Sequence, residues 1–344
     1  MKNTPIAIYL NLILIVILLF VVDFTFVNSY IIGDITDYDI LNNFKNYLLD
    51  NSKVFDEIYQ SFINSLVLGE PLEGELKNDM IDIGVYHIMS LSGLHIGILY
   101  MVLNYILKFS KNKYLNFVII AFVLIFYGCL TGLKIPTLRA IIMCIIASFG
   151  KVIGRSNNSL NTLSIASIIM ILYNNEFIYS ASFILSFVMV AGIIIYGKLL
   201  NNIFDALLYK YENIMKIVPY ITLAISGFIV SMPLSLHFFG KVNILSIMSN
   251  IAIAFIVPII FILGLFTLLS GVSIFVGLTS KFIDYILFIV EVVNKFNTKI
   301  ISEDFSMIYV VITYILVYFI LNLILNILKN KGGKYARENK NSNK

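Results

Sequence analysis

The segment MIYVVITYILVYFILNLILNIL, residues 307–328, contains 22 residues and no charged side chain. A membrane-spanning helix needs about 20 consecutive, mostly apolar residues, so this segment is long enough to cross a bilayer. The whole chain has the same character, because 59% of its 344 residues are hydrophobic and 13% are charged, with a mean hydropathy of +0.92. A soluble domain is about 45–50% apolar and about 25% charged. The composition therefore excludes a soluble globular enzyme, a disordered chain and, with two cysteines, a secreted disulfide scaffold.

Nine further apolar segments predict an all-α fold, that of a polytopic helical membrane protein. A transmembrane β-barrel is excluded, because its strands alternate polar and apolar residues and these segments are apolar throughout. The fifth segment is short, and the ninth carries three charged residues, so it either lies flat on the membrane or faces the protein interior. We expect about 8–10 transmembrane helices, with broken or re-entrant segments. The candidate spans are residues 5–22, 84–107, 115–133, 135–153, 160–174, 177–197, 217–239, 243–269, 272–293 and 307–328.

The distribution of charge divides the chain into four parts. We expect an N-terminal membrane anchor (1–22), an external acidic segment with an amphipathic helix (23–83), a polytopic membrane domain (84–328) and a basic cytoplasmic tail (329–344). The first span lacks a small-x-small cleavage pattern after it, which favours an uncleaved anchor over a signal peptide.

The same charges predict the topology. The external segment holds twelve acidic residues and three lysines, a net charge of −9, whereas the tail has a net charge of +5. Alternate connections between the spans are basic, and basic connections of membrane proteins are enriched on the cytoplasmic side. Both termini are therefore expected in the cytoplasm. The overall charge of +4 is interpreted as a topology signal rather than as the mark of a nucleic-acid-binding surface.

Residues 40–66 of the external segment repeat apolar side chains at helical spacing, and Gly69 and Pro71 end the pattern. We expect an amphipathic helix that either lies on or dips into the outer membrane face, or forms a small packed cap over the helix bundle. The apolar stripe consists of Phe55, Ile58, Tyr59, Phe62, Ile63 and Leu66.

Polar residues within the spans require an explanation, because an ionisable residue at the bilayer centre costs about 2.5–3.5 kcal/mol. In GVYHIMSLSGLHIGIL (84–99), His87 and His95 flank the pair Ser92 and Gly93. The two histidines would be about 80° apart around one helix, so both could line a cavity. Ser92 and Gly93 are a candidate helix break. Alternatively, the small residues allow close packing and the histidines hydrogen-bond across helices.

A second polar cluster occurs in YGCLTGLKIPTLRAIIM (127–143). Gly132 and Pro136 predict an irregular turn, and Lys134 can extend its ammonium to the outer interface. Arg139 lies one turn deeper. Its guanidinium either clamps the end of a broken helix or meets an anionic substrate.

A third cluster occurs in SMPLSLHFFGKVNILSIMSNIAIAFIVPII (231–260), which contains Asn250. Pro233 and Pro258 predict kinks or breaks in these helices.

Catalysis is not expected. Ser92 and His95 face the same way on a helix, but an intramembrane serine dyad normally draws its members from different helices, and no G-x-S-x-G elbow is present. The three histidines show no ligand spacing such as H-E-x-x-H. We therefore expect no enzymatic activity, no catalytic residue, no metal site and no cofactor.

The order of these motifs resembles the competence domain of the ComEC family. The resemblance covers roughly residues 55–270 and rests on SFINSLVLGE (61–70), the S-G-L-H signature at 92–95, the R-A pair at 139–140, FILSFVMVAG (183–192) and the 231–260 segment. It implies a multi-pass channel in the bacterial plasma membrane that takes up single-stranded DNA during natural transformation. Small residues at 92–93 would leave room for the strand, and Lys134 and Arg139 would offset phosphate charge. The residues that match its motifs, implied to line or shape the pore, are His87, Ser92, Gly93, His95, Arg139 and Asn250.

Long members of this family add an external OB-like domain and a C-terminal nuclease-like domain. The external segment here is too short and too acidic for an OB fold that binds DNA, and the chain ends soon after its last span, so we expect a short form with the competence domain only. No G-x-x-x-x-G-K-[ST] motif occurs, so a separate motor is expected. The implied partners are single-stranded DNA, the lipid bilayer, an external DNA receptor, a cytoplasmic ATPase motor, a separate nuclease and further copies of the chain in a homo-oligomer.

Two other interpretations stay open. A small-solute secondary transporter would carry internal inverted repeats, which the sequence does not show convincingly. A non-transporting membrane scaffold would need none of the polar residues within the spans.

Overall fold

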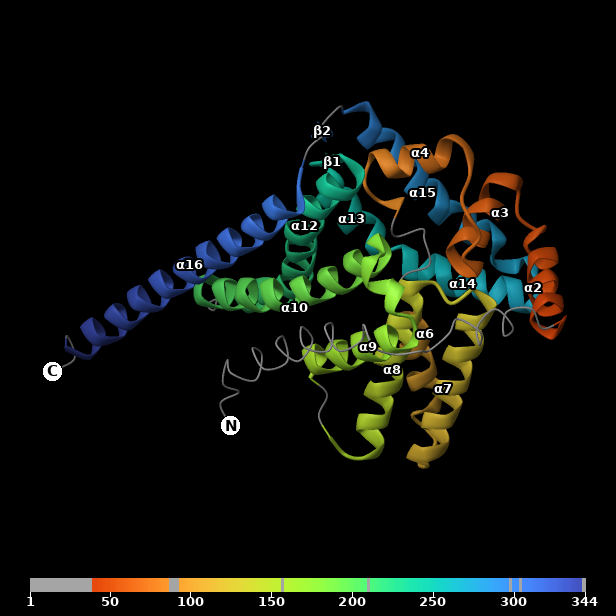
Figure 1. Cartoon of the computed structure of the whole chain (residues 1–344), viewed down its shortest axis with the longest axis horizontal. Helices are drawn as coiled ribbons and strands as arrows, with labels where there is room; N and C mark the ends of the chain where they lie inside the picture. The colour runs from red at the N-terminus through yellow and green to blue at the C-terminus, as the bar shows by residue number, and fades with distance from the viewer. Residues whose placement is uncertain are drawn as a thin grey trace. The chain divides into compact units, whose positions relative to one another are not determined.

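The computed structural model describes residues 39–86, 93–155, 158–208, 211–296, 299–302 and 305–341 (Figure 1). The expected anchor at 5–22 and the candidate pore residues His87 and Ser92 lie outside the described residues.

The described chain is almost entirely helical, which confirms the all-α prediction. Its two short strands, β1 (Lys241–Asn243) and β2 (Lys299–Ile301), form an antiparallel pair in which Val242 lies opposite Ile300. The helices are α2 (Asp39–Ser52), α3 (Glu57–Ile63), the π-helix η2 (Asn64–Leu68), α4 (Gly74–Asp82), α6 (Gly93–Leu107), α7 (Lys113–Leu130), α8 (Ile135–Val152), α9 (Ser159–Tyr173), the 3₁₀ helix η3 (Asn175–Tyr179), α10 (Ala181–Leu208), α11 (Glu212–Met215), α12 (Val218–Phe239), α13 (Ser246–Ala254), α14 (Val257–Ser270), the 3₁₀ helix η4 (Ser273–Phe275), α15 (Val276–Lys295) and α16 (Met307–Asn341).

Several of these helices are long and apolar enough to cross a membrane, so the chain is a multi-pass membrane protein. Within the described residues six qualify, namely α7, α8, α10, α12, α16 and the segment Ser273–Lys295. The pair α13 and α14 would make a seventh crossing. α6 and α9 are apolar but have 15 residues each. At about 1.5 Å per residue each is about 22 Å long, shorter than the hydrocarbon core of about 30 Å.

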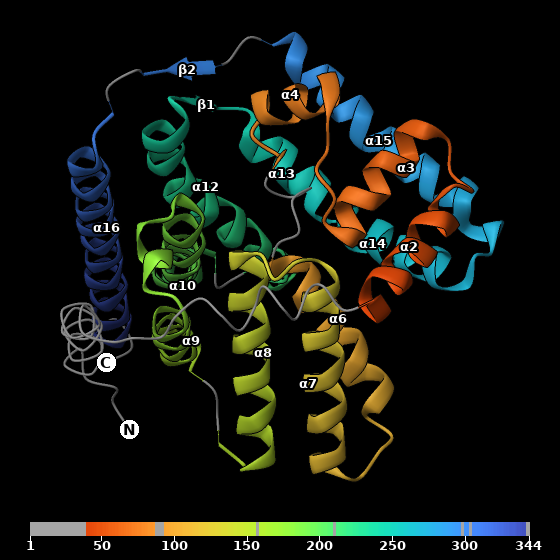
Figure 2. The same ribbon diagram turned by 45° about the vertical axis from the view of Figure 1, so that its right-hand side comes forward.

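The helices form two compact units. The first runs up to Ser186 and includes Ile251–Asn297, and the second consists of Phe187–Asn250 and the chain from Thr298 onward. In the first unit, α6, α7 and α8 run side by side (Figure 2). In the second unit, α12 packs against α16.

The helix expected over 40–66 is divided into α2, α3 and η2, because the chain turns at residues 53–56. Phe62, Ile63 and Leu66 are fully buried, and α3 and η2 pack against α14. The packing is close, since a Cβ added at Gly264 of α14 would lie 3.0 Å from Cδ1 of Ile63. Ile58 departs from the expected stripe and is 60% exposed. Of the two expected arrangements, these contacts favour the packed cap.

The charged residues of the ninth candidate span do not face the protein interior. On α15, Lys281, Asp284 and Glu291 are exposed, whereas Ile283 and Ile286 on the opposite face are buried. The alternative prediction, that the charged residues of this segment face the protein interior, is therefore wrong, because the buried face is apolar and the charged face is exposed.

The turn between α7 and α8 has a defined backbone geometry. The N–H of Gly132 donates to the Cys129 carbonyl at 3.2 Å, and that of Leu133 donates to the Gly128 carbonyl at 2.9 Å. These two bonds form a Schellman motif, which requires a left-handed residue after the helix, and Gly132 has a φ of +80°. Pro136 lies in the first turn of α8, where a missing N–H leaves no helical bond unmade.

The two prolines of the 231–260 segment behave differently. Of the kink or break expected at Pro233, the break is excluded, because α12 runs through this residue without interruption. The carbonyl that Pro233 leaves without a helical donor is that of Ile229, four residues earlier. Close by, the Tyr314 hydroxyl of α16 donates to the Val230 carbonyl of α12 at 2.6 Å and joins the two helices. Pro258 lies in the first turn of α14, directly after the 45° bend that separates α13 from α14.

In the second unit, α10 and α12 approach each other closely at Gly192. A Cβ added at Gly192 would lie 2.3 Å from Cγ2 of the buried Val230, so only glycine fits at this position. Gly192→Ala should lower the free energy of unfolding by about 1–3 kcal/mol, because overpacking forces the helices apart. The chain has no tryptophan, so its two free cysteines, Cys129 and Cys144, supply the readout through a thiol-reactive dye during a thermal melt in detergent.

The matched control is Gly227→Ala on α12, where an added Cβ would approach only Ile193 Cδ1, at 4.0 Å. Its melting midpoint should stay the same or rise, since alanine favours helix by about 1 kcal/mol over glycine. Equal midpoints for Gly192→Ala and the wild type would contradict the close approach.

Candidate functional site

His95 lies in the first two turns of α6 and is fully buried. Its ring packs against Phe261 of α14, with 5.1 Å between the ring centroids and 53° between the planes. The imidazole therefore contributes to the packed contact between α6 and α14 in the first unit.

Tyr127 of α7 continues this aromatic cluster. Its ring meets Phe261 edge-on at 6.3 Å, and its hydroxyl donates to the Val67 carbonyl at 2.5 Å. Val67 lies in the last turn of η2, which ends at Leu68 and is followed by Gly69 in a left-handed conformation, so its carbonyl has no donor further along the helix. The Tyr127 hydroxyl therefore satisfies a buried acceptor at the end of the π-helix η2. Such single-turn π-helices often occur at functional sites.

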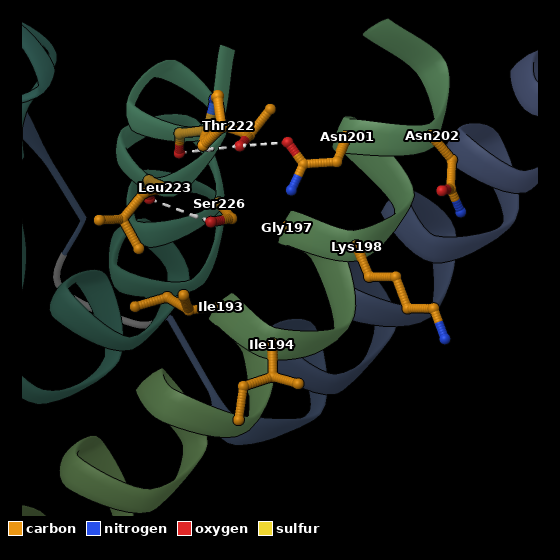
Figure 3. A pocket seen from close by; sticks show the side chains of 10 residues that line it. Ile193, Ile194, Gly197, Lys198, Asn201, Asn202, Thr222, Leu223 and Ser226 are labelled. Atoms are coloured by element: carbon orange, nitrogen blue, oxygen red, sulfur yellow. Dashed lines mark hydrogen bonds between the residues drawn. The ribbon is translucent and has the colours of Figure 1, made fainter. Parts of the chain in front are cut away.

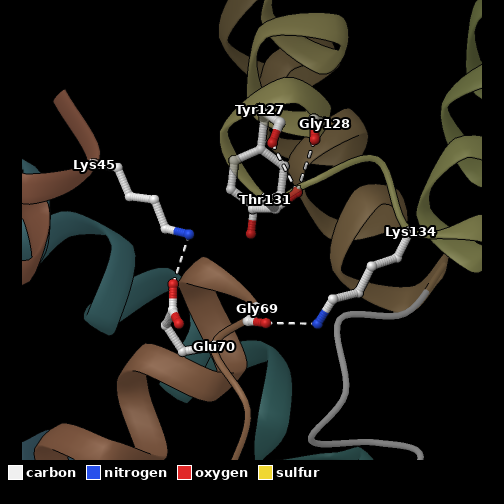
Figure 4. Close-up of polar contacts among 7 residues, drawn as sticks. All are labelled: Lys45, Gly69, Glu70, Tyr127, Gly128, Thr131 and Lys134. Atoms are coloured by element: carbon white, nitrogen blue, oxygen red, sulfur yellow. Dashed lines mark hydrogen bonds and ion pairs between the residues drawn. The ribbon is translucent and has the colours of Figure 1, made fainter. Parts of the chain in front are cut away.

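The residues that follow η2 are held from two sides (Figure 4). Lys134 donates from Nζ to the Gly69 carbonyl at 2.5 Å, and Lys45 of α2 forms a 2.6 Å ion pair with Glu70. Partial burial lowers the pKa of Lys134 below its ordinary value, and the neighbouring Glu70 carboxylate opposes this shift. The ammonium of Lys134 thus bonds to a backbone carbonyl. It connects the α7–α8 turn to the cap, which consists of α2, α3, η2 and the residues directly after η2.

Arg139 is the most deeply buried cation of the predicted set, with 8% of its surface exposed. Its Nη1 donates to the Ser186 carbonyl in α10. A Cβ added at Gly93 would lie 2.7 Å from Nη2, so the guanidinium lies directly against the first described residue of α6. These contacts agree with the interpretation that Arg139 clamps the end of a helix, because its guanidinium joins the beginnings of α6 and α10.

Four of the predicted residues, Gly93, His95, Lys134 and Arg139, belong to the first unit, and of these Gly93 and Arg139 lie against each other. Asn250 belongs to the second unit, where its Oδ1 is buried and has no hydrogen-bond partner among the described residues. Within the described ranges, no group of three or more His, Cys, Asp or Glu side chains could hold a metal ion.

Sequence reasoning missed Tyr127, the Lys45–Glu70 pair and the Ser186 carbonyl. A signal for Tyr127 was present, because a tyrosine in an apolar span needs a partner for its hydroxyl. The ion pair and the carbonyl carried no local signal, since their partners are distant in the sequence.

The chain has recognisable relatives among known proteins. Residues 66–328 match a family model described as "Competence protein". The ComE operon protein 3 of Bacillus subtilis (strain 168) is 23% identical over 216 residues, which cover 62% of this chain and 26% of that protein. An uncharacterized protein of Aquifex aeolicus (strain VF5) is 26% identical over 178 residues, which cover 50% of this chain and 42% of that protein. The match therefore spans less than half the length of either relative, and no solved structure matches the chain.

Gly93→Ala tests the contact between α6 and Arg139. The added methyl forces Nη2 of Arg139 to shift, and we expect this shift to weaken the bond from Nη1 to the Ser186 carbonyl. The free energy of unfolding should therefore fall by at most about 1.5–3 kcal/mol, the contribution of a charged hydrogen bond. Gly97→Ala on the same helix is the control, because nothing lies within 4 Å of its added Cβ. If both variants melt at the wild-type midpoint in the dye assay, the Gly93–Arg139 contact is wrong.

Tyr127→Phe tests the hydroxyl that supports η2. The Val67 carbonyl loses its donor while the aromatic packing remains, which should cost about 1–3 kcal/mol of stability. Tyr105→Phe is the control, since Tyr105 of α6 is 67% exposed. Identical midpoints for the two variants would show that the buried hydrogen bond contributes nothing.

Proposed function

Because the chain belongs to the competence protein family, whose model matches residues 66–328, we propose that it is a membrane channel for the uptake of single-stranded DNA during natural transformation. The family match carries a role in competence, and the channel activity is our proposal for this chain. The aligned residues cover 26% and 42% of the two relatives described above.

The observation that carries this proposal is the buried arginine within the family-matched region. An arginine inside a membrane domain is costly and usually faces a polar path or a specific partner. Arg139 keeps its positive charge, because a guanidinium does not lose its proton in proteins. A phosphate that passes at about 8 Å would gain about 2 kcal/mol at an effective dielectric constant of about 20. The arginine can therefore act on the strand through its field while it clamps α8 to Ser186.

The other members of the predicted set take supporting roles in this proposal. His95 and Lys134 fix the positions of α6 and of the α7–α8 turn through Phe261 and Gly69. Gly93 leaves the space that the guanidinium occupies. His87, Ser92 and Asn250 stay predicted pore residues.

We place the channel in the bacterial plasma membrane with both termini in the cytoplasm. The support is the charge distribution, with −9 on segment 23–83 and +5 on the tail. The acidic segment would repel DNA at short range, so an external receptor has to deliver the strand. We assign no catalytic role to this chain. A cytoplasmic ATPase would drive transport, and a separate nuclease would degrade the other strand.

A small-solute secondary transporter is the second candidate. The observation that favours it is the broken pair α13 and α14, because transporters bind solutes at discontinuous helices. The two functions predict different losses in a strain that lacks the gene. The channel predicts loss of DNA uptake, and the transporter predicts loss of uptake of a small solute.

The test is uptake of labelled DNA in a deletion strain that carries either the wild-type gene or a variant. DNA that resists external DNase should be absent without the gene and restored by the wild type. Arg139→Ala should reduce it at least tenfold, whereas Arg139→Lys, which keeps the charge, should restore part of it. Arg155→Ala is the matched control, because Arg155 lies exposed just beyond the other end of α8.

Normal DNase-resistant uptake in the deletion strain would refute the DNA-channel proposal. Full rescue by Arg139→Ala would refute only the role of that arginine. Variant levels in the membrane and melting midpoints in the dye assay separate a loss of transport from a loss of folding.

A further inference from the structure

A pocket of about 350 Å³ lies between α10 and α12 in the second unit (Figure 3). Its lining is polar at one end and apolar at the other. Lys198, Asn201 and Asn202 of α10 form the polar end together with Thr222 of α12. None of the predicted site residues lines this pocket.

The polar end offers hydrogen-bond donors. The Thr222 hydroxyl donates to Oδ1 of Asn201 at 2.8 Å, which fixes the side-chain amide and turns its Nδ2 toward the pocket (Figure 3). Lys198 lies one turn earlier on α10 and also lines the pocket, and its flexible side chain, which extends away from the Asn201 amide in Figure 3, carries an ammonium with three donors. Asn202 adds a second amide. An ammonium and two amides within one helical turn suit the oxygens of a phosphate.

The other end of the pocket suits a hydrocarbon chain. Ile193 and Ile194 of α10 and Leu223 of α12 line it. These side chains cannot hydrogen-bond to a charged ligand. A ligand that fills the whole pocket must therefore be amphiphilic.

The position along α10 matches the edge of a bilayer. Lys198 follows the first residue of this helix, Ala181, by seventeen positions, which is about 26 Å at about 1.5 Å per residue. The hydrocarbon core of a bilayer is about 30 Å thick, so the polar end lies near the level of the headgroups. Thr222 lies one turn into α12, close to where that helix begins at Val218.

We propose that this pocket binds one phospholipid of the bilayer. Its phosphate lies at Lys198, Asn201 and Asn202, and one acyl chain follows Ile193, Ile194 and Leu223. Asp205 is exposed one turn beyond Asn201 on the same face, so a headgroup with one negative charge fits better than one with several. The proposal stands independently of DNA uptake.

The experiment is native mass spectrometry of the purified protein in detergent, titrated with phosphatidylglycerol. Lys198→Gln should weaken binding of the first lipid about tenfold, as expected for the loss of one charge-assisted hydrogen bond. Gly197→Leu should also weaken it, because the side chain fills the pocket and leaves every polar group in place. Lys216→Gln is the matched control, since Lys216 is exposed outside the pocket, and it should bind as the wild type does.

Two outcomes would overturn the proposal. Unchanged lipid affinity in both Lys198→Gln and Gly197→Leu would mean that lipid binds elsewhere on the surface. Displacement of phosphatidylglycerol by an oligothymidylate, with oligothymidylate binding itself lost in Lys198→Gln, would assign the pocket to nucleic-acid phosphate instead. Melting midpoints without added lipid show whether each variant is folded.

Discussion

The first unit depends on three side chains that each donate a hydrogen bond to a backbone carbonyl far away in the sequence. Tyr127 donates to Val67, Lys134 to Gly69 and Arg139 to Ser186. The Val67 and Gly69 carbonyls lie at the C-terminal end of η2, where carbonyls have no partner within the helix, so a side-chain donor satisfies a group that burial would otherwise leave unpaired. The Ser186 carbonyl lies within α10, so the Arg139 guanidinium adds a second donor there and joins α8 to α10. In this chain two of the three donors are cations.

Two of these donors, Lys134 and Arg139, hold helices in place and also carry a positive charge. Lys134 and Arg139 hold the α7–α8 turn and the beginning of α8 against the cap and α10. Their charges remain within the membrane domain, where the effective dielectric constant is low and a charge acts over several ångströms. In the proposed channel, Arg139 holds α8 to α10 and also lowers the cost of moving a phosphate past it, whereas Lys134 fixes the α7–α8 turn. Variants at these positions would accordingly affect folding and transport together, and conservative changes are needed to separate the two.

Sequence reasoning predicted the helical membrane class, because long apolar segments have few alternatives. It also predicted the turn at Gly132 and Pro136, whose requirements are local. It was only partly right at Pro233 and in the cap. α12 continues through Pro233, which excludes the break and leaves the kink, the other expected outcome. The helix expected over 40–66 is divided by the turn between α2 and α3, and Ile58 of the expected stripe is exposed. The partners of Arg139 and Lys134 were not predictable, because a backbone carbonyl leaves no trace in the sequence.

The most direct measurement is photo-crosslinking of DNA during uptake. Transforming DNA that contains 4-thiothymidine is irradiated while it enters the cell, and the modified peptides of this chain are identified by mass spectrometry. The proposed path predicts adducts in residues 84–107 and 128–139, which surround Gly93 and Arg139. Adducts confined to other segments, or no adduct while DNA continues to enter, would contradict it.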